Sequence, residues 1–329
     1  MTDAAAFNIL AVVQGGRLGY EALLLAASLQ ATNPGFGGRL FLAEPQPGPL
    51  WDRDPRLTDQ VLRARLEELG AIFLPFENRV FGASYPHGNK IEALAALPEA
   101  PFLFLDTDTL VTGDLAKVAF DFARPSASMR REGTWPQIEL YGPGYAAIWA
   151  SLYDRFGLDY HGSLDLTQPE EYWQRHLYFN AGWFFHHSPA QFGARFLGYA
   201  QEIRDNRPAA LTCQELYPWL DQIALPLVVH ALGGGRPGPE LAGLDGEVTC
   251  HYRNLSLLYA RESDLAVRVL EQVAETKENR RLLRDWPQVK QIVYQNGGRK
   301  ARALFDRAAL PHREQAIRNT LKREGLWLR

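Results

Sequence analysis

The chain has 329 residues, of which 46% are hydrophobic and 12% aromatic, and its formal net charge at pH 7 is −3. These values exclude an intrinsically disordered chain, and they give no whole-chain argument for binding nucleic acid or an anionic membrane. The two cysteines, Cys213 and Cys250, are too few for a disulfide framework or a zinc cluster, and they favour a reducing cytoplasm.

Apolar runs and helical patterns alternate along the first third of the chain. Helical spacing predicts helices over 20–30, 58–69 and 89–97, and short apolar runs predict strands over 8–13, 39–43, 71–76 and 102–105. Such alternation is typical of a Rossmann-like α/β fold, a mostly parallel sheet flanked by helices. The chain starts without the basic segment of a secretion signal, and no apolar run reaches transmembrane length. We therefore expect a soluble, cytoplasmic protein.

The regularity loosens after residue 114. Residues 126–144 carry Arg130, Arg131 and several glycines, and we expect a long loop there at the border of a cleft. The apolar run 178–186 predicts another strand, followed by a helix to about residue 203. The segment 233–246 is dense in glycine and proline and is predicted to be a loop.

The tail of the chain is basic. From Lys277 onward, 14 Lys and Arg stand against 5 Asp and Glu, a net charge of +9 that leaves −12 for the preceding residues. Helical patterns recur over 301–309 and 314–325. The simpler interpretation is a solvated helical appendix, and the sharper hypothesis is peripheral contact with an anionic membrane or an acidic partner.

The most informative segment is the buried run from Phe102 to Leu105, which ends in Asp106-Thr107-Asp108. Open α/β sheets bind ligands at the carboxyl ends of their strands, so we expect both carboxylates at a ligand site. Carboxylate oxygens suit Mg²⁺ or Mn²⁺, and these ions often share their coordination with substrate phosphates. Aspartates after a strand also serve as turn or cap residues, so the pair alone does not identify a reaction.

Residues 102–115, FLFLDTDTLVTGDL, resemble the Asp-x-Asp segment of GT-A-fold glycosyltransferases. The likeness is strongest to family eight, which includes glycogenins and bacterial lipopolysaccharide galactosyltransferases. Three further segments follow in the family's order, namely Phe179-Asn180-Ala181-Gly182, Asp221-Gln222 and Cys250-His251-Tyr252. The resemblance covers about residues 7–255. It implies a GT-A-like, nucleotide-sugar-binding catalytic domain over 1–258, with residues 259–329 as a basic helical C-terminal extension.

The resemblance implies a metal-dependent hexosyltransferase. Mn²⁺ or Mg²⁺ would be held by Asp106, Asp108 and His251 and would bind the diphosphate of a UDP-sugar donor, with Asp106 also near the ribose. Asn180, Asp221 and Gln222 would bind the reacting sugar. Asp221 would be the base of an inverting displacement or a stabiliser in a retaining one, and family likeness favours retention. The implied acceptor is a glycan or a lipid-linked glycan.

Further residues are candidates for binding the nucleotide. Val13 ends the first predicted strand, and Gln14 and Gly15 follow it, where glycine lets the backbone approach a base and ribose, although a tight turn also explains it. Lys90 is either a contact to phosphate or nucleotide or a solvated residue in a helical first turn. The family's usual Lys-Pro-Trp after the late histidine is missing here, and Arg253 would replace the charge of its phosphate-binding lysine.

Three alternatives to a glycosyltransferase remain open from the sequence. The segment Asp106-Thr107-Asp108 also resembles the nucleophile motif of haloacid-dehalogenase phosphatases, although that motif normally follows the first strand of its domain. A sugar nucleotidyltransferase shares the strand order and metal use, and Gly15-Gly16-Arg17 faintly resembles its loop. A sugar-nucleotide-binding module without catalytic activity would keep the same fold.

Overall fold

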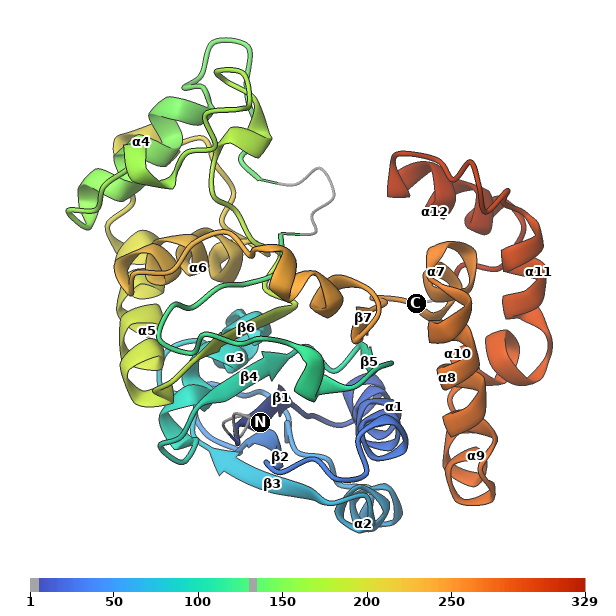
Figure 1. Ribbon diagram of the computed structural model, residues 1–329. Coiled ribbons are helices and arrows are strands. Elements are labelled where there is room, and N and C mark those ends of the chain that lie inside the picture. The colour runs from blue at the N-terminus through green and yellow to red at the C-terminus, as the bar shows by residue number, and fades with distance from the viewer. Residues whose placement is uncertain (1–5, 130–134, 329) are drawn as a thin grey trace.

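A five-stranded sheet forms the centre of the computed structural model, which describes residues 6–129 and 135–328 (Figure 1). Its strand order is β3-β2-β1-β4-β6. Four strands run parallel, namely β1 (Asn8–Val12), β2 (Leu40–Pro45), β3 (Ala71–Phe76) and β4 (Phe102–Leu105). The edge strand β6 (Trp183–His186) pairs antiparallel with β4. The prediction of a mostly parallel α/β sheet is confirmed.

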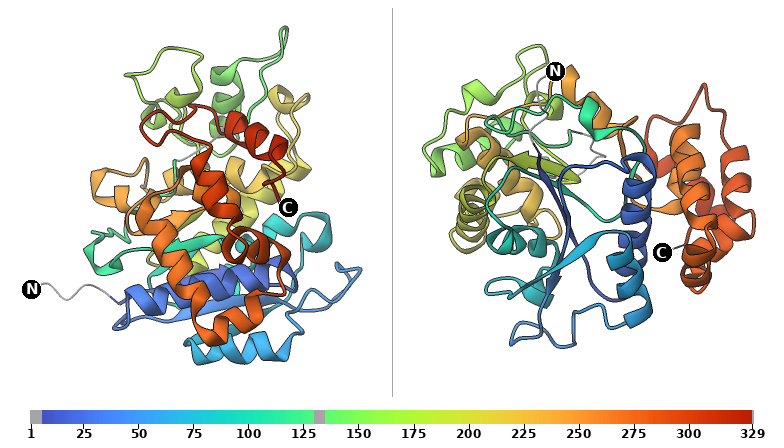
Figure 2. Two further views of the ribbon diagram at one scale, coloured as in Figure 1. Left: turned by 90° about the vertical axis from the view of Figure 1, so that its right-hand side faces the viewer. Right: turned by 60° about the horizontal axis from the view of Figure 1, so that its bottom comes forward.

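Both faces of this sheet are buried. In β4, Leu103 and Leu105 belong to one apolar core, whereas Phe102 and Phe104 belong to the other. The first face is covered by α1 (Arg17–Thr32) and α2 (Gln60–Glu68), and the second by α5 (Pro189–Asp205) and α6 (Leu220–Ala231) (Figures 1 and 2). Burial on both faces explains why the strands are uninterrupted apolar runs in the sequence instead of alternating patterns.

Several predicted elements differ at their ends. The N-cap of α2 is Asp59, whose Oδ1 accepts hydrogen bonds from the backbone N–H groups of Val61 and Leu62, so this helix starts at Gln60 and not at the predicted residue 58. Residues 178–182 are not strand, because Ala181 has a left-handed φ of 56° that interrupts extended backbone.

Two other predicted helices are shorter than expected. The helix predicted over 89–97 consists of α3 (Asn89–Glu92) and a 3₁₀ segment (Ala93–Ala96). The helix predicted over 301–309 ends with α11 (Gly297–Ala303), after which Asp306 accepts a hydrogen bond from the N–H of Ala308 and favours a turn. The predicted loop at 233–246 contains a 3₁₀ segment, Pro239–Asp245. Arg130 and Arg131 of the long predicted loop lie outside the described residues.

A second, two-stranded sheet positions part of the candidate site. β5 (Thr109–Val111) starts directly after Asp108 and pairs antiparallel with β7 (Thr249–His251). In this register Thr109 lies opposite His251, and the backbone N–H of Tyr252 donates to the carbonyl of Asp108 over 2.9 Å. The pairing therefore brings the late histidine beside the aspartates, although more than a hundred residues separate them in the chain.

The C-terminal helices lie beyond α1 (Figures 1 and 2). They are α7 (Leu255–Arg261), α8 (Asp264–Glu275), α9 (Lys277–Leu283), α10 (Pro287–Val289), α11 and α12 (Glu314–Arg323), and α4 (Tyr145–Arg155) lies at the opposite end of the molecule. α8 contacts α1, and α11 contacts α7. The predicted domain boundary at residue 258 falls inside α7, and both this division and a membrane contact of the tail remain predictions. Among the described helices, none combines the length and apolar character needed to cross a bilayer.

Candidate active site

The site lies where the strand order of the main sheet reverses, between β1 and β4. Parallel sheets form a crevice for ligands at this point, beyond the carboxyl ends of the two strands. Gln14 follows β1 and Asp106 follows β4, and together with Lys90 they line a pocket of about 250 Å³. The topology thus places both sequence candidates at the same edge of the sheet.

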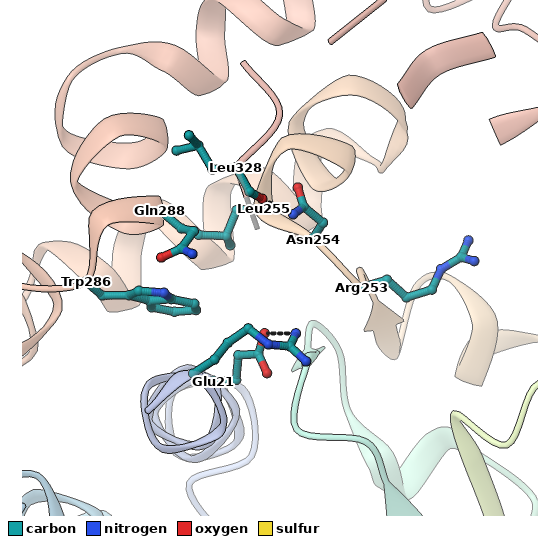
Figure 3. Close-up of a pocket in the computed structure, with 8 residues that line it drawn as sticks. Glu21, Arg253, Asn254, Leu255, Trp286, Gln288 and Leu328 are labelled. Atoms are coloured by element: carbon teal, nitrogen blue, oxygen red, sulfur yellow. Dashed lines mark hydrogen bonds and ion pairs between the residues drawn. The ribbon is translucent and has the colours of Figure 1, made fainter. Parts of the chain in front are cut away.

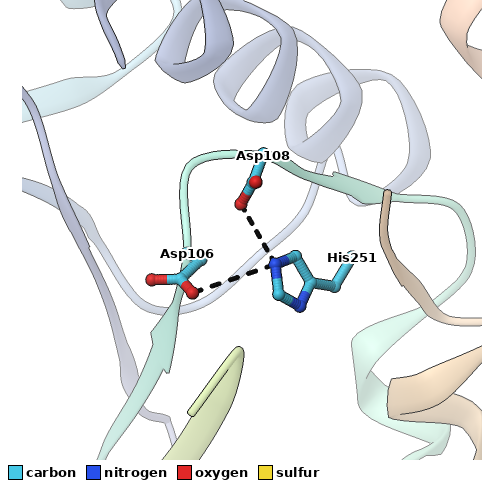
Figure 4. Close-up of side chains that lie close together, drawn as sticks. All are labelled: Asp106, Asp108 and His251. Atoms are coloured by element: carbon cyan, nitrogen blue, oxygen red, sulfur yellow. Dashed lines mark ion pairs between the residues drawn. The ribbon is translucent and has the colours of Figure 1, made fainter. Parts of the chain in front are cut away.

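Two carboxylates and one imidazole converge in this crevice (Figure 4). Each of Asp106, Asp108 and His251 offers a ligand atom within 4.8 Å of the others. His251 Nε2 lies 3.2 Å from Asp108 Oδ1 and 3.8 Å from Asp106 Oδ2. Carboxylate oxygens with one imidazole nitrogen form a donor set that suits Mn²⁺, so these residues fit the metal ion that the resemblance implies.

We refer to Asp106, Asp108 and His251 as the acidic cluster. The charges of these residues shift one another's pKa values. Burial opposes ionisation of Asp108, but His251 and Arg17 outweigh it and lower the pKa of Asp108 to about 2. Burial also disfavours the imidazolium form of His251, but the two aspartates outweigh that effect and raise the pKa of His251. A divalent ion binding to the cluster therefore competes with a proton on His251.

The segment Phe179-Asn180-Ala181-Gly182 contacts two of the candidate metal ligands. Asn180 Oδ1 accepts a hydrogen bond of 2.8 Å from the N–H of Gly182, and the N–H of Asp106 donates to the Gly182 carbonyl over 2.9 Å. A Cβ atom at position 182 would collide with Nδ1 of His251, so only glycine leaves room for the imidazole ring. This segment therefore positions both Asp106 and His251.

Lys90 is buried between two acidic groups of the site. Its Nζ lies 2.9 Å from Asp106 Oδ1 and 3.4 Å from Asp221 Oδ2, and it donates a hydrogen bond of 3.1 Å to the carbonyl of Ala181. Burial by itself lowers the pKa of Lys90, but Asp106 and Asp221 outweigh it, so the pKa is raised and the ammonium group stays charged. The alternative interpretation of Lys90 as a solvated residue is wrong, because only 7% of the residue is exposed.

The sugar-binding candidates lie in the same cleft as the acidic cluster. Asp221 stands in the first turn of α6, where its Oδ1 accepts a hydrogen bond of 2.7 Å from the Tyr85 hydroxyl. Gln222 Oε1 accepts one of 2.9 Å from the hydroxyl of Tyr178. Asn180, Asp221 and Gln222 line a cleft of about 930 Å³ together with Asp106, Asp108 and His251. The fold thus brings these sequence candidates together.

The nucleotide candidates are only partly assembled around the site. Gln14 and Gly15 line a pocket of about 340 Å³ next to Arg17 and Trp51. Val13 is fully buried and does not line the pocket at the end of β1, where Val12 stands instead. Arg253 lines the main cleft, and its contact with phosphate remains a prediction.

Sequence reasoning did not include several residues that line the cleft among the site residues of a glycosyltransferase. Arg17, which follows the two glycines after β1, lines the main cleft and also pairs with Glu21 across 2.8 Å in a neighbouring pocket of about 290 Å³ (Figure 3). Trp219 lines the main cleft and stands just before Asp221. Position next to a motif could have identified both residues. Arg313 and Arg318 also line the cleft, but they lie in the tail with no motif nearby.

Comparison with known families identifies the chain. Residues 9–233 match the Rhodobacterales glycosyltransferase domain family. The chain belongs to this glycosyltransferase family. No curated protein matches the chain. The match includes Asp106, Asp108, Asn180 and Asp221 and ends before β7, so His251 and Arg253 of this glycosyltransferase are assigned from geometry.

Solved glycosyltransferases are similar at low sequence identity. The galactosyltransferase LgtC, in complex with donor and acceptor sugar analogs, is 14% identical with a TM-score of 0.48, covering 82% of this chain and 96% of its own. The bifunctional glycosyltransferase WbbM is 13% identical with a TM-score of 0.47, covering 86% of this chain and 52% of its own. GlyE of Streptococcus pneumoniae TIGR4 is 14% identical with a TM-score of 0.42, covering 87% of this chain and 64% of its own. Similarities this low carry no argument about activity. The glycosyltransferase activity of this chain is therefore inferred from its family membership, and its chemistry is argued from the residues of its own site.

Proposed function

We propose that this glycosyltransferase depends on Mn²⁺ or Mg²⁺ and transfers a hexose from a UDP-sugar to a glycan or lipid-linked glycan. The observation that carries the proposal is the convergence of Asp106, Asp108 and His251 at the switch point of the sheet. These three residues would hold the ion. When bound, it would supply Lewis-acid stabilisation to the diphosphate leaving group.

Lys90 and Asp221 would act together on the donor sugar. Asp221 Oδ2 lies 3.4 Å from the buried Lys90 ammonium group and Oδ1 accepts a hydrogen bond from the Tyr85 hydroxyl, so both carboxylate oxygens already have partners within the protein. This arrangement supports a stabilising role for Asp221 in a retaining reaction over a base in an inverting one. Asn180 and Gln222, which line the same cleft, would hydrogen-bond hydroxyl groups of the sugar.

The nucleoside would occupy the pocket of about 340 Å³ that Gln14 and Gly15 line. Gln14 offers an amide there, and its Oε1 accepts a hydrogen bond of 3.4 Å from Asn89 Nδ2. Gly15 and Trp51 line the same pocket, so backbone and an aromatic ring can both approach a base. Arg253 would contact the diphosphate in place of the lysine of family eight.

The family match favours glycosyl transfer over the phosphatase and nucleotidyltransferase alternatives. The aspartate pair also follows β4 instead of the first strand of the domain, which further argues against the phosphatase. A binding module without catalytic activity differs from an enzyme in having no turnover, and release of UDP from a UDP-hexose tests this directly.

The decisive experiment is calorimetry with UDP, with and without Mn²⁺, on the wild type and Asp108→Ala. We expect UDP binding that requires both Mn²⁺ and Asp108, because the carboxylate is part of the ion's donor set. The matched control is Asp285→Ala, which removes an exposed carboxylate in the tail and should bind UDP like the wild type. Binding that survives in Asp108→Ala would refute the metal assignment, and absence of UDP binding to the wild type would refute the UDP-sugar donor.

A further inference from the structure

A buried carboxylate in the tail organises three arginines. Glu314, at the start of α12, is only 2% exposed. Its carboxylate forms ion pairs with Arg253, Arg261 and Arg318, and Nη1 of Arg261 lies 2.6 Å from Oε2. These arginines come from the segment after β7, from α7 and from α12. We refer to Glu314 and these arginines as the arginine cluster.

Part of the arginine cluster lines one wall of the main cleft. Three guanidinium groups surround Glu314, and Arg261 also lies 3.5 Å from Glu262. Arg253 and Arg318 line the cleft, with side chains 25% and 34% exposed.

Arg253 and Arg318 are positioned to contact a phosphate group that lies next to the candidate metal ligands. Arg253 follows His251 by two residues, and its backbone has a left-handed φ of 59°, a conformation that non-glycine residues adopt at a cost. Arg253 and Arg318 line the same cleft as Asp106, Asp108 and His251. Guanidinium groups bind phosphate oxygens through two parallel hydrogen bonds, which gives both affinity and orientation.

We propose that Glu314 holds Arg253 and Arg318 beside the candidate metal ligands, and that the two arginines form a binding site for the donor's diphosphate. The C-terminal helix α12 is then part of the donor site and not a separate appendix. Arg318 is a ligand-binding residue in this scheme, and Glu314 is a positioning residue. The inference rests on the proposed function, since it assigns the diphosphate of that donor to these side chains.

The test compares UDP with uridine, because the two ligands differ only in the diphosphate. Binding to the full chain with saturating Mn²⁺ is measured by calorimetry for UDP and by ligand-observed NMR for uridine. We expect Arg318→Ala to weaken UDP binding by about tenfold, the value of one charge-assisted contact, and to leave uridine binding unchanged. Arg318→Lys keeps the charge without the two-pronged geometry and should give an intermediate loss.

The matched control is Arg323→Ala, which removes an equal charge from the same helix at a side chain that is 72% exposed and outside the cleft. It should bind both ligands like the wild type. UDP binding to Arg318→Ala at the wild-type level would overturn the inference and leave the proposed function intact. An equal loss of UDP and uridine binding would also overturn it, because the effect would not be specific to phosphate. Absence of UDP binding to the wild type would instead overturn the proposed donor, and the inference with it.

Discussion

Two charge clusters of opposite composition line the same cleft. The acidic cluster places two carboxylates around one imidazole, and the arginine cluster places three guanidinium groups around one carboxylate. The first is held by the main sheet and the β5–β7 pair, the second by α7, α12 and the segment between β7 and α7.

The two clusters differ in the part of the proposed ligand that each would bind. Carboxylate oxygens and an imidazole would hold a divalent cation, whereas guanidinium groups would hold phosphate oxygens. In the proposed function, the ion and the diphosphate of the donor would therefore contact different clusters. The experiments below separate the contributions of the two clusters, from the largest expected effect to the smallest.

Asp221→Asn tests whether the acidic side of the cleft acts on the sugar. The substitution keeps the shape and removes the charge that pairs with Lys90, so we expect turnover to fall by about 10²–10³-fold, as for other single groups that stabilise a transition state. The measurement is the release of UDP from UDP-glucose or UDP-galactose, which requires no acceptor. UDP affinity should not change, because Asp221 would contact the sugar. A parallel loss of UDP affinity would contradict this division of roles.

Glu314→Ala tests how strongly the arginine cluster supports the fold. Removing the carboxylate leaves three guanidinium groups close together without their shared partner. We expect a loss of about 2–3 kcal/mol in the free energy of unfolding, less than the 3–5 kcal/mol of a fully buried pair because the arginines remain partly exposed. Urea denaturation measures this loss, with Glu324→Ala as an exposed control expected to cost less than about 0.5 kcal/mol. Equal stability of Glu314→Ala and the wild type would show that the cluster contributes nothing to folding.

Glu21→Gln tests a buried acid that shares a pocket with Arg253. Glu21 lines the pocket of Figure 3 with Arg253, and its Oε2 is buried without a hydrogen-bond partner among the described residues. Burial, reinforced by Asp108, raises the pKa of Glu21 well above its usual range. The folded state therefore favours the protonated acid, so this contribution to stability is complete below the unfolded pKa and is lost as the pH rises through the folded pKa.

Glutamine resembles the protonated acid at every pH. We expect Glu21→Gln to unfold at a temperature at least about 2 °C above that of the wild type at pH 8, with the difference vanishing near pH 4. Thermal unfolding between pH 4 and pH 8 measures the difference, and Glu278→Gln at an exposed position should show none. A difference that does not depend on pH would show that packing, and not ionisation, is responsible.

Local patterns were sufficient for much of the fold. The four parallel strands were predicted because strands buried on both faces are short, uninterrupted apolar runs. The end of β4 could likewise be predicted to carry Asp106 and Asp108 into the ligand crevice, because topology dictates where such strands end. Element ends were less accurate, since the left-handed Ala181 and the Asp59 cap depend on individual backbone geometry.

Contacts between distant segments could not be derived from local patterns. The placement of His251 beside Asp108 depends on the pairing of β5 with β7, and β5 is too short to produce a clear pattern. Lys90 could not be distinguished from a solvated residue, because its burial comes from groups on other elements. The basic tail showed its charge in the sequence but not that Glu314 gathers Arg253 and Arg318 at the cleft.

The sequence by itself determined the α/β sheet, the pair of carboxylates at its edge and, through its motifs, the resemblance to glycosyltransferases. Only the tertiary structure decided which charges meet, including the buried Lys90 and the arginine cluster on the wall of the cleft. The physical reason is the range of the interactions. Secondary structure follows from periodic burial over a few residues, whereas ion pairs between remote segments depend on how helices and strands pack after the chain has folded.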